Sequence, residues 1–223
     1  MRSKHQSLGL VFILVAALPL RAQEMSVVHD GLDVGRRATQ RAFEVTTRSD
    51  EDDERIVRSD TDYHIIADVP LDAMAMVFLN RDRIADYMPN LHEYAWTPVA
   101  AEPGDVVIEV QRIGVRFMGI DATYHIRQRS EVIDRRSQEP RRFIVEYEMI
   151  ESLDGKLASS SGAFLLEEME VDGRPVTYMR QLNTTEFQDP FRGFPRILRA
   201  FAPGGTRRLF RAMIDEAERY TAR

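Results

Sequence analysis

The chain of 223 residues contains no cysteine. This absence excludes a disulfide framework, a zinc ribbon, an iron–sulfur cluster, a thiol nucleophile and a lipidated N-terminal cysteine. Lysine is also scarce, because arginine supplies nearly all of the 30 basic residues. The 36 acidic residues outnumber the basic ones and give a net charge of −6. An acidic balance of this kind argues against nucleic-acid binding by the protein as a whole.

The motifs of several enzyme classes are missing as well. There is no Gly-x-Ser-x-Gly, His-Glu-x-x-His, P-loop or Gly-x-Gly-x-x-Gly sequence. The histidines are scattered without metal-ligand spacing, so we expect neither a metal nor a cofactor. The acidic run at residues 50–54 lacks the spaced carboxylates and the glycine turn of a calcium loop, and it indicates a solvated loop instead.

Long apolar runs are absent after the first twenty residues. Residues 8–20 form an apolar run that follows Arg2 and Lys4 and precedes Ala22. This is the layout of a secretory signal, and the run is shorter than the ~20 residues that a spanning helix needs. We therefore predict a signal peptide at residues 1–22 and a periplasmic protein, with an uncleaved N-terminal anchor as the alternative.

What remains has the composition of a globular protein. Hydrophobic residues make up 43% of the chain and charged residues 30%, and the length suits one domain or two small ones. We expect residues 23–56 to be a partly flexible leader segment, and residues 57–223 to form one ligand-binding domain. Whether the leader folds onto the domain is left open by its sequence.

Hydrophobic periodicity divides this domain into elements. Residues 63–69 alternate as a strand that Pro70 ends, and helical spacing predicts short helices at 71–78 and 81–88. From residue 91 the period changes to two, with turn-like Gly, Pro, Asp and Ser between the runs. The further strands that we expect are 91–98, 105–117, 121–133, 141–152, 160–171 and 175–186. A helix with one apolar face follows from residue 206 to about 220.

This order of elements predicts an α+β fold. An antiparallel sheet of about seven strands has one face to cover, and the long C-terminal helix is the element able to cover it. We therefore expect a helix-grip arrangement, in which a curved sheet wraps around the C-terminal helix and two short helices follow the first strand.

The local sequence also resembles a known superfamily over residues 57–223. The passage from Val69-Pro70 through Tyr87 to Met88-Pro89, and the later Gly162-x-Phe164-x-Leu166, are similar to the START and birch-pollen-allergen superfamily, which includes polyketide cyclases and coenzyme Q-binding proteins. The resemblance implies an apolar cavity between the sheet and the C-terminal helix. It also implies a hydrophobic ligand without naming it.

Alternation along each strand assigns candidate cavity residues. They are Val110, Arg112, Tyr124, Ile126, Phe143, Val145, Tyr147, Gly162, Phe164, Leu166, Tyr178 and Arg180 on strands, and Phe210, Met213 and Ile214 on the helix. The alternative for each of them is ordinary core, whose residues touch the helix instead of a void. Arg112 and Arg180 interrupt apolar rows, so each must pair with a carboxylate, lie at a strand end or meet a polar group of the ligand.

One segment combines arginines and aromatic residues. Residues 190–211 hold six arginines and no acidic residue, and Pro203-Gly204-Gly205 suggests a hinge before the final helix. We predict a membrane-facing gate, because arginines attract anionic head groups and phenylalanines enter the interface. Its residues are Phe191, Arg192, Phe194, Arg196, Arg199 and Phe201. The alternative is that the apolar residues cap the cavity while the arginines balance an acidic neighbouring surface.

Three hypotheses about function follow. The first is an exported protein that binds or transfers a hydrophobic small molecule, foremost a lipid, with transient membrane contact and with no nucleic-acid or metal partner. The second is a cyclase or isomerase type of enzyme that uses Tyr124, Tyr147 or His125 for proton transfer in the same cavity. The third is an interaction module whose groove is filled by its own side chains.

Overall fold

The computed structural model describes residues 27, 31–35, 38–49, 54–102, 106–117, 119–133 and 141–222. The predicted signal peptide lies outside these described residues, as does the acidic run apart from Glu54.

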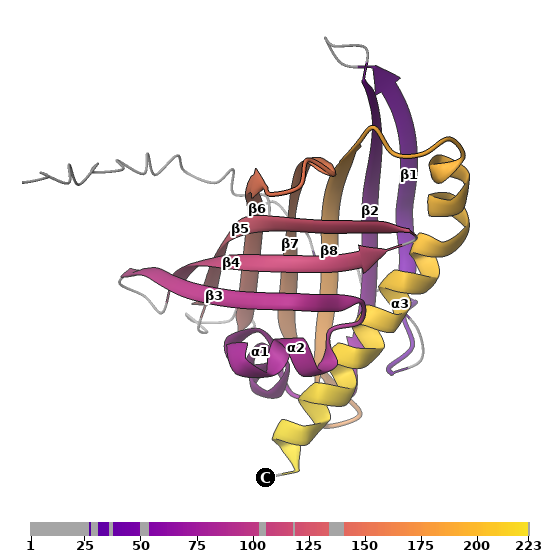
Figure 1. Ribbon diagram of the computed structural model, residues 1–223. Coiled ribbons are helices and arrows are strands. Elements are labelled where there is room, and N and C mark those ends of the chain that lie inside the picture. The colour runs from indigo at the N-terminus through magenta and orange to yellow at the C-terminus, as the bar shows by residue number, and fades with distance from the viewer. Residues whose placement is uncertain are drawn as a thin grey trace, which may run out of the picture.

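One antiparallel sheet of eight strands dominates the fold (Figure 1). The strands are β1 (Thr39–Ser49), β2 (Arg55–Ala67), β3 (Leu91–Glu102), β4 (Val106–Phe117), β5 (Ile120–Ile133), β6 (Arg142–Ser152), β7 (Leu157–Val171) and β8 (Arg174–Gln188). Their order across the sheet is β1-β2-β8-β7-β6-β5-β4-β3. The sheet curls so strongly that β3, β4 and β5 cross in front of β7 and β8 in Figure 1.

The helices lie on the concave side and at one end of this sheet (Figure 1). They are α1 (Leu71–Leu79), the 3-10 turn η1 (Arg81–Arg83), α2 (Ile84–Tyr87) and α3 (Phe194–Thr221). Pro70 precedes α1 and Asp72 lies in its first turn, both of which favour a helix start there. Helix α3 contacts α1 and β1. The predicted α+β helix-grip fold is therefore confirmed, with eight strands instead of about seven.

The additional strand is β1, which lies in the segment expected to be a leader. It pairs with β2 along its whole length, from Thr39 opposite His64 to Ser49 opposite Arg55. Val45 is its only buried residue, because β1 is an edge strand whose two faces are mostly open. The hydrophobic alternation that reveals a strand in a sequence is therefore too weak here.

Three described residues before β1 cover part of the outer, convex face of the sheet. Val27, Leu32 and Val34 pack against Ile66, Val176 and Tyr178. The amide of Gly35 donates to the carbonyl oxygen of Ile66 at 2.7 Å. The centre of the sheet is consequently apolar on both faces. The two faces therefore do not differ in polarity there, and the sequence does not show which of them is the inner one.

Helix α3 begins twelve residues earlier than the sequence predicts. It starts at Phe194, and Pro203 lies inside it, so the expected hinge at residues 203–205 is part of the helix. Pro195 stands in the first turn, where its missing N–H costs little. Phe194, Leu198 and Ala202 are buried in a cluster with Val45. These contacts offset the ~3 kcal/mol that an internal proline costs.

Candidate functional site

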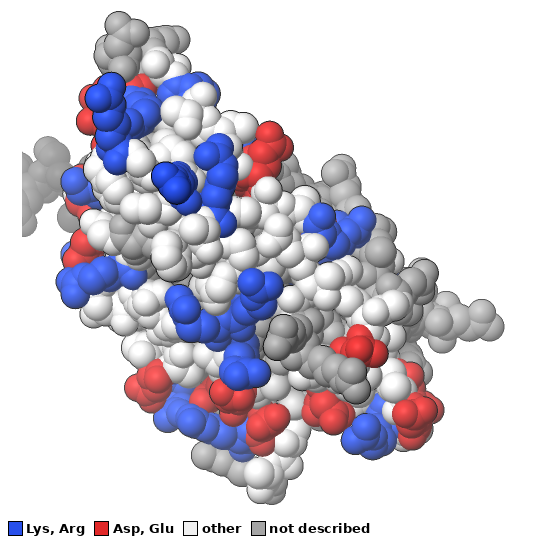
Figure 2. Space-filling view, turned by 90° about the vertical axis from the view of Figure 1, so that its right-hand side faces the viewer, with Lys and Arg blue, Asp and Glu red and all other residues white. Residues whose placement is uncertain are grey.

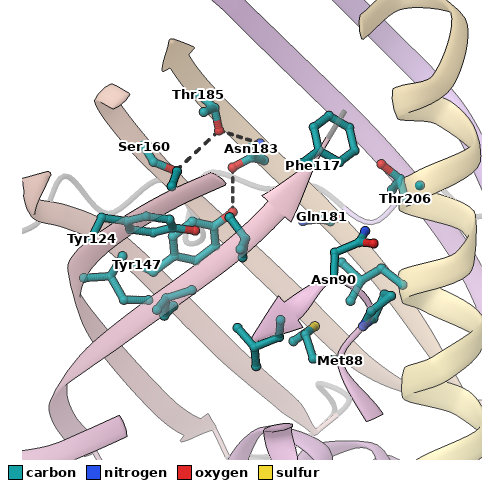
Figure 3. A pocket seen from close by; sticks show the side chains of 18 of the residues that line it. Met88, Asn90, Phe117, Tyr124, Tyr147, Ser160, Gln181, Asn183, Thr185 and Thr206 are labelled. Carbon is teal, nitrogen blue, oxygen red and sulfur yellow. Dashed lines mark hydrogen bonds between the residues drawn. The ribbon is translucent and has the colours of Figure 1, made fainter. Parts of the chain in front are cut away.

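A cavity of about 370 Å³ lies between the concave face of the sheet and α3 (Figure 3). Strands β4, β5 and β8, the segment of residues 88–91 and the inner face of α3 supply most of its walls. Most of the wall is aliphatic or aromatic. The apolar lining includes Ile113, Val115, Phe117, Ile120, Ala122, Ile126, Leu157, Phe164, Phe187, Leu198, Ala202, Leu209 and Met213.

No Asp, Glu, Lys, Arg or His occurs among the described residues that line the cavity. Its polar groups are hydroxyls and amides, on Ser59, Thr61, Tyr87, Asn90, Tyr94, Gln111, Tyr124, Gln128, Tyr147, Ser160, Gln181, Asn183, Thr185 and Thr206. Burial raises the pKa of Tyr124 to about 12 and moves the pKa values of Tyr87, Tyr94 and Tyr147 upward as well. The phenols are therefore protonated at neutral pH, and the lining carries no charge.

A first polar cluster crosses β6, β7 and β8 (Figure 3). The Tyr147 hydroxyl donates to Asn183 Oδ1 at 2.7 Å, and Asn183 Nδ2 donates to Thr185 Oγ1 at 3.2 Å. The hydroxyls of Thr185 and Ser160 lie 3.4 Å apart. Gln181 stands next to Asn183 on the same face of β8, and its amide interacts with the phenol of Tyr147.

A second polar chain leads from η1 into the cavity wall. Arg81 Nε donates to both carboxylate oxygens of Glu109, at 2.5 and 2.7 Å, in a buried ion pair. Gln111 Nε2 donates to Glu109 and, at 3.1 Å, to Gln128 Oε1. Gln128 in turn donates to Ser130 at 3.2 Å. Because both Gln111 N–H groups are used in this chain, its carbonyl oxygen is the group left for the cavity.

Five of the predicted cavity residues lie in the wall: Tyr124, Ile126, Tyr147, Phe164 and Met213. Six others lie on the concave side but do not reach the void: Phe143, Val145, Gly162, Leu166, Phe210 and Ile214. Most of these pack with Phe78 of α1, which fills the space on the concave side of the sheet next to α1. Gly162 is covered by the ring of Tyr147, since a Cβ there would lie 2.6 Å from Tyr147 Cζ.

Four predicted residues belong to the opposite face, so their assignment was wrong. Val110 and Arg112 alternate with the inward-facing Gln111 and Ile113 on β4, and Tyr178 and Arg180 alternate with the inward-facing Gln181 on β8. On β8 the error arose because Tyr178 packs under the N-terminal segment and is as buried as a core residue. On β4 the inner row contains the polar residues Glu109 and Gln111, whereas Val106, Ile108 and Val110 make the outer row look like the core face.

The two arginines are used in ion pairs on that outer face. Arg112 Nε lies 2.6 Å from Glu93 Oε1 on the exposed surface. Arg180 donates from Nε and Nη2 to the two carboxylate oxygens of Asp62, at 2.9 and 2.8 Å. Of the three roles considered for them, pairing with a carboxylate is the one observed.

Sequence reasoning missed the polar side of the cavity. Gln111, Gln181, Asn183 and Thr185 were not predicted, because a polar residue in a strand ordinarily indicates the solvent face. The pairing of residues between antiparallel strands is the information that would have identified them. Asn183 is paired with Gly162, which is itself paired with Tyr147, so the three share one face.

The predicted gate is only partly at the surface. Phe191 and Phe201 are 45% and 60% exposed, whereas Phe194 is fully buried and was wrongly placed in the gate. Arg192, Arg196 and Arg199 are exposed, and Arg199 donates to the carbonyl oxygen of Val45 at 2.7 Å. Figure 2 shows Arg side chains gathered over the upper and middle part of this face, with acidic side chains toward its lower end.

Neither metal ligation nor membrane spanning is evident in the described part of the chain. No group of three or more His, Asp or Glu side chains there could hold a metal ion. His125, considered above for proton transfer, lies on the outer face beside Glu151, with Nδ1 3.4 Å from a carboxylate oxygen. None of the described helices is both long and apolar enough to cross a membrane.

No family model and no curated protein sequence matches the chain. Solved structures do resemble it. Human STARD10 aligns with 81% of this chain and 74% of its own at 9% identity and a TM-score of 0.52. The STAR-related lipid transfer protein of Xanthomonas axonopodis (fragment 25–204) aligns with 78% and 98% at 10% identity and a TM-score of 0.50.

An aromatase/cyclase from a Streptomyces species, Zhui, aligns with 74% of this chain and 96% of its own, at 16% identity and a TM-score of 0.48. At such identities the likeness to solved structures shows the fold. The chain has the START-type helix-grip fold, which confirms the predicted resemblance at that level.

Proposed function

We propose that this START-type protein is an exported carrier that encloses one hydrophobic molecule, a lipid, in the cavity under α3. The observation that carries the proposal is the cavity itself, which is apolar over most of its wall and uncharged. Its volume of about 370 Å³ falls within the ~300–1,000 Å³ of pockets that hold one small ligand. Each methylene that leaves water for such a wall contributes about 0.8 kcal/mol.

The lining favours a carrier over an enzyme. General acid–base catalysis works best with a group whose pKa lies near the operating pH. The titratable groups among the described lining residues are phenols, and burial moves their pKa values upward, away from neutrality. Tyr147 already donates its proton to Asn183. The described wall thus offers binding contacts without a base that titrates near neutral pH.

Export and membrane contact complete the proposal. The signal-like residues 1–22 support export, since a lipid needs a carrier where it must cross an aqueous space. Membrane contact would occur at the N-terminal half of α3. There Arg192 and Arg196 form no ion pair with any residue that the structure describes, and Phe191 and Phe201 are exposed. Leu198 and Ala202 of the same helix line the cavity, so ligand entry and membrane contact would share one element.

A cavity-filling variant tests the proposal. Diphenylhexatriene, a neutral apolar probe that fluoresces when it leaves water, should bind the purified protein at one site. Ala122→Phe should abolish this binding, because Ala122 is buried in the wall. The matched control Ala95→Phe places the same ring at an exposed position of β3 and should leave binding unchanged. Equal probe binding by the two variants would reject the cavity as the site.

A further inference from the structure

One side chain in the cavity lacks the partner that burial demands. Gln181 is only 8% exposed, and its Oε1 atom accepts no hydrogen bond from any described residue. It belongs to β8 and lines the cavity. A buried amide oxygen without a donor is costly, and native structures nearly always satisfy such atoms. The missing group is therefore a hydrogen-bond donor that enters the cavity.

The hydrogen bonds donated by the neighbours of Gln181 go to other acceptors. The hydroxyl of Tyr147 donates to Asn183, and the amide of Asn183 donates to Thr185. The hydroxyl of Thr61 donates to the backbone carbonyl oxygen of Asn183. The hydroxyl protons of Tyr147 and Thr61 and one amide proton of Asn183 are engaged in this way, and no described residue donates to the oxygen of Gln181.

A second acceptor of the same kind lies on the other wall. Gln111 uses both of its amide protons on Glu109 and Gln128, and no described residue donates to its Oε1 atom. The buried pair of Arg81 and Glu109 fixes this orientation, because the carboxylate accepts from Gln111 as well as from Arg81. The carbonyl oxygens of Gln181 and Gln111 are thus both open to a donor among the contents of the cavity.

The absence of charge from the described lining limits the kind of donor. A buried ammonium or guanidinium would need a carboxylate, and a buried carboxylate would need a cation. The carboxylate of Glu109 accepts from the cavity residue Gln111, and it is already paired with Arg81. A donor that carries no charge, such as a hydroxyl or an amide N–H, is what this wall accommodates.

We infer that the molecule bound here is an uncharged lipid whose buried end bears a hydroxyl group that donates to Gln181 Oε1. This inference rests on the proposed function and names the ligand class. Long-chain alcohols, monoacylglycerols and hydroxylated ring systems belong to that class. Fatty acids do not, because they are ionised in water at neutral pH and would have to be neutralised in order to bury the carboxyl group here. The apolar lining around Phe164 and Ile126 would hold the rest of the molecule.

Three probes of equal chain length test the inference: 1-dodecanol, dodecyl methyl ether and laurate at pH 8, each displacing diphenylhexatriene. The wild-type protein should bind the alcohol about tenfold more tightly than the ether, which has the same chain but no donor. Laurate should bind more weakly than the alcohol. In Gln181→Met, which keeps the length of the side chain and removes the acceptor, the alcohol-to-ether preference should fall to about one.

The controls separate this inference from the function that it rests on. Gln188→Met makes the same change on the same strand, where the side chain bonds Glu54 outside the cavity, and it should keep the full preference.

Equal binding of alcohol and ether by the wild type, or an unchanged preference in Gln181→Met, would overturn the inference while leaving the carrier intact. Tighter binding of laurate would overturn it too. Failure of every probe to bind would reject the carrier itself. Since the preference is a ratio within one protein, partial destabilisation of a variant does not alter it.

Discussion

The hydroxyl of Tyr147 on β6 reaches across β7 to Asn183 on β8, where it donates a hydrogen bond of 2.7 Å. The residue that it crosses is Gly162, which is paired with Tyr147 on one side and with Asn183 on the other. The absence of a side chain at Gly162 therefore lets an aromatic ring lie flat on the sheet and form part of the cavity wall.

The first prediction concerns this close approach. Gly162→Ala would place a Cβ 2.6 Å from Tyr147 Cζ and 2.5 Å from the carbonyl oxygen of Leu182, so the ring must move. We expect a loss of about 1–3 kcal/mol in the free energy of unfolding and weaker binding of diphenylhexatriene. Urea denaturation and probe titration measure the two effects. Unchanged stability would show that the ring does not lie on Gly162.

The second prediction separates a carrier from an enzyme. Tyr124→Phe and Tyr147→Phe remove the two phenols considered for proton transfer but keep both rings in the wall. Binding of the neutral probe should stay within about threefold of the wild type, because the substitutions alter neither the charge of the wall nor, by much, its volume. Tyr147→Phe alone should also lose about 1–3 kcal/mol of stability, because Asn183 Oδ1 loses its donor. Tyr124 makes no hydrogen bond with the described residues, so its variant provides the control. A loss of probe binding in both variants would contradict the prediction.

The third prediction concerns acid stability. Glu216 of α3 is buried, which raises its pKa, but hydrogen bonds and charges of Arg83 and Arg219 lower it more, so the net pKa lies below its usual range. A carboxyl whose pKa is lower in the folded state stabilises the protein above its unfolded pKa of about 4.3, and this stabilisation is lost as the pH falls through the folded value.

Glu216→Gln should accordingly reduce the free energy of unfolding at pH 7 by about 1 kcal/mol, since the side chains of Arg83 and Arg219 are 38% and 62% exposed and solvent screens them. The difference between variant and wild type should shrink toward pH 3. Denaturant unfolding at pH 7, 5, 4 and 3 measures it. A difference that stays constant over this range would mean that the charge of Glu216 is not what stabilises this contact.

The fourth prediction tests membrane contact by the N-terminal half of α3. Arg192→Gln combined with Arg196→Gln removes two exposed charges, each worth about 1 kcal/mol beside anionic lipid. Transfer of probe to phosphatidylserine-containing vesicles should slow by roughly tenfold or more, with transfer to neutral vesicles unchanged. Arg112→Gln with Arg116→Gln removes two exposed arginines of β4 and serves as the control. Equal slowing by the control pair would point to net charge instead of a specific surface.

The elements that could be predicted from sequence are those whose two faces differ in polarity. On β5, Ala122, Tyr124 and Ile126 face the concave side while His125 and Arg127 face outward, so alternation assigned them correctly. Each of the predicted strands from residue 63 onward corresponds to a strand of the sheet. Here a local property of the chain, its polarity pattern, directly reflects burial.

The features that escaped prediction depend on partners distant in sequence. Tyr178 is buried by the segment that precedes β1, and no pattern within β8 distinguishes that burial from a cavity face. The first turns of α3 form despite Pro203 because Leu198 and Ala202 are buried against other elements. The polar cavity groups, Gln181 above all, depend on register between strands, which a single sequence does not display. The signal peptide remains a prediction.

The measurement that tests the central proposal most directly is native mass spectrometry of the protein purified from a periplasmic extract, with solvent extraction of whatever is bound. We predict one uncharged, hydroxyl-bearing lipid per chain, and loss of that mass in Ala122→Phe but not in Ala95→Phe. A protein that emerges without ligand and takes up none from mixed-lipid vesicles would contradict the carrier and favour an enzyme on a small substrate or a partner-binding module.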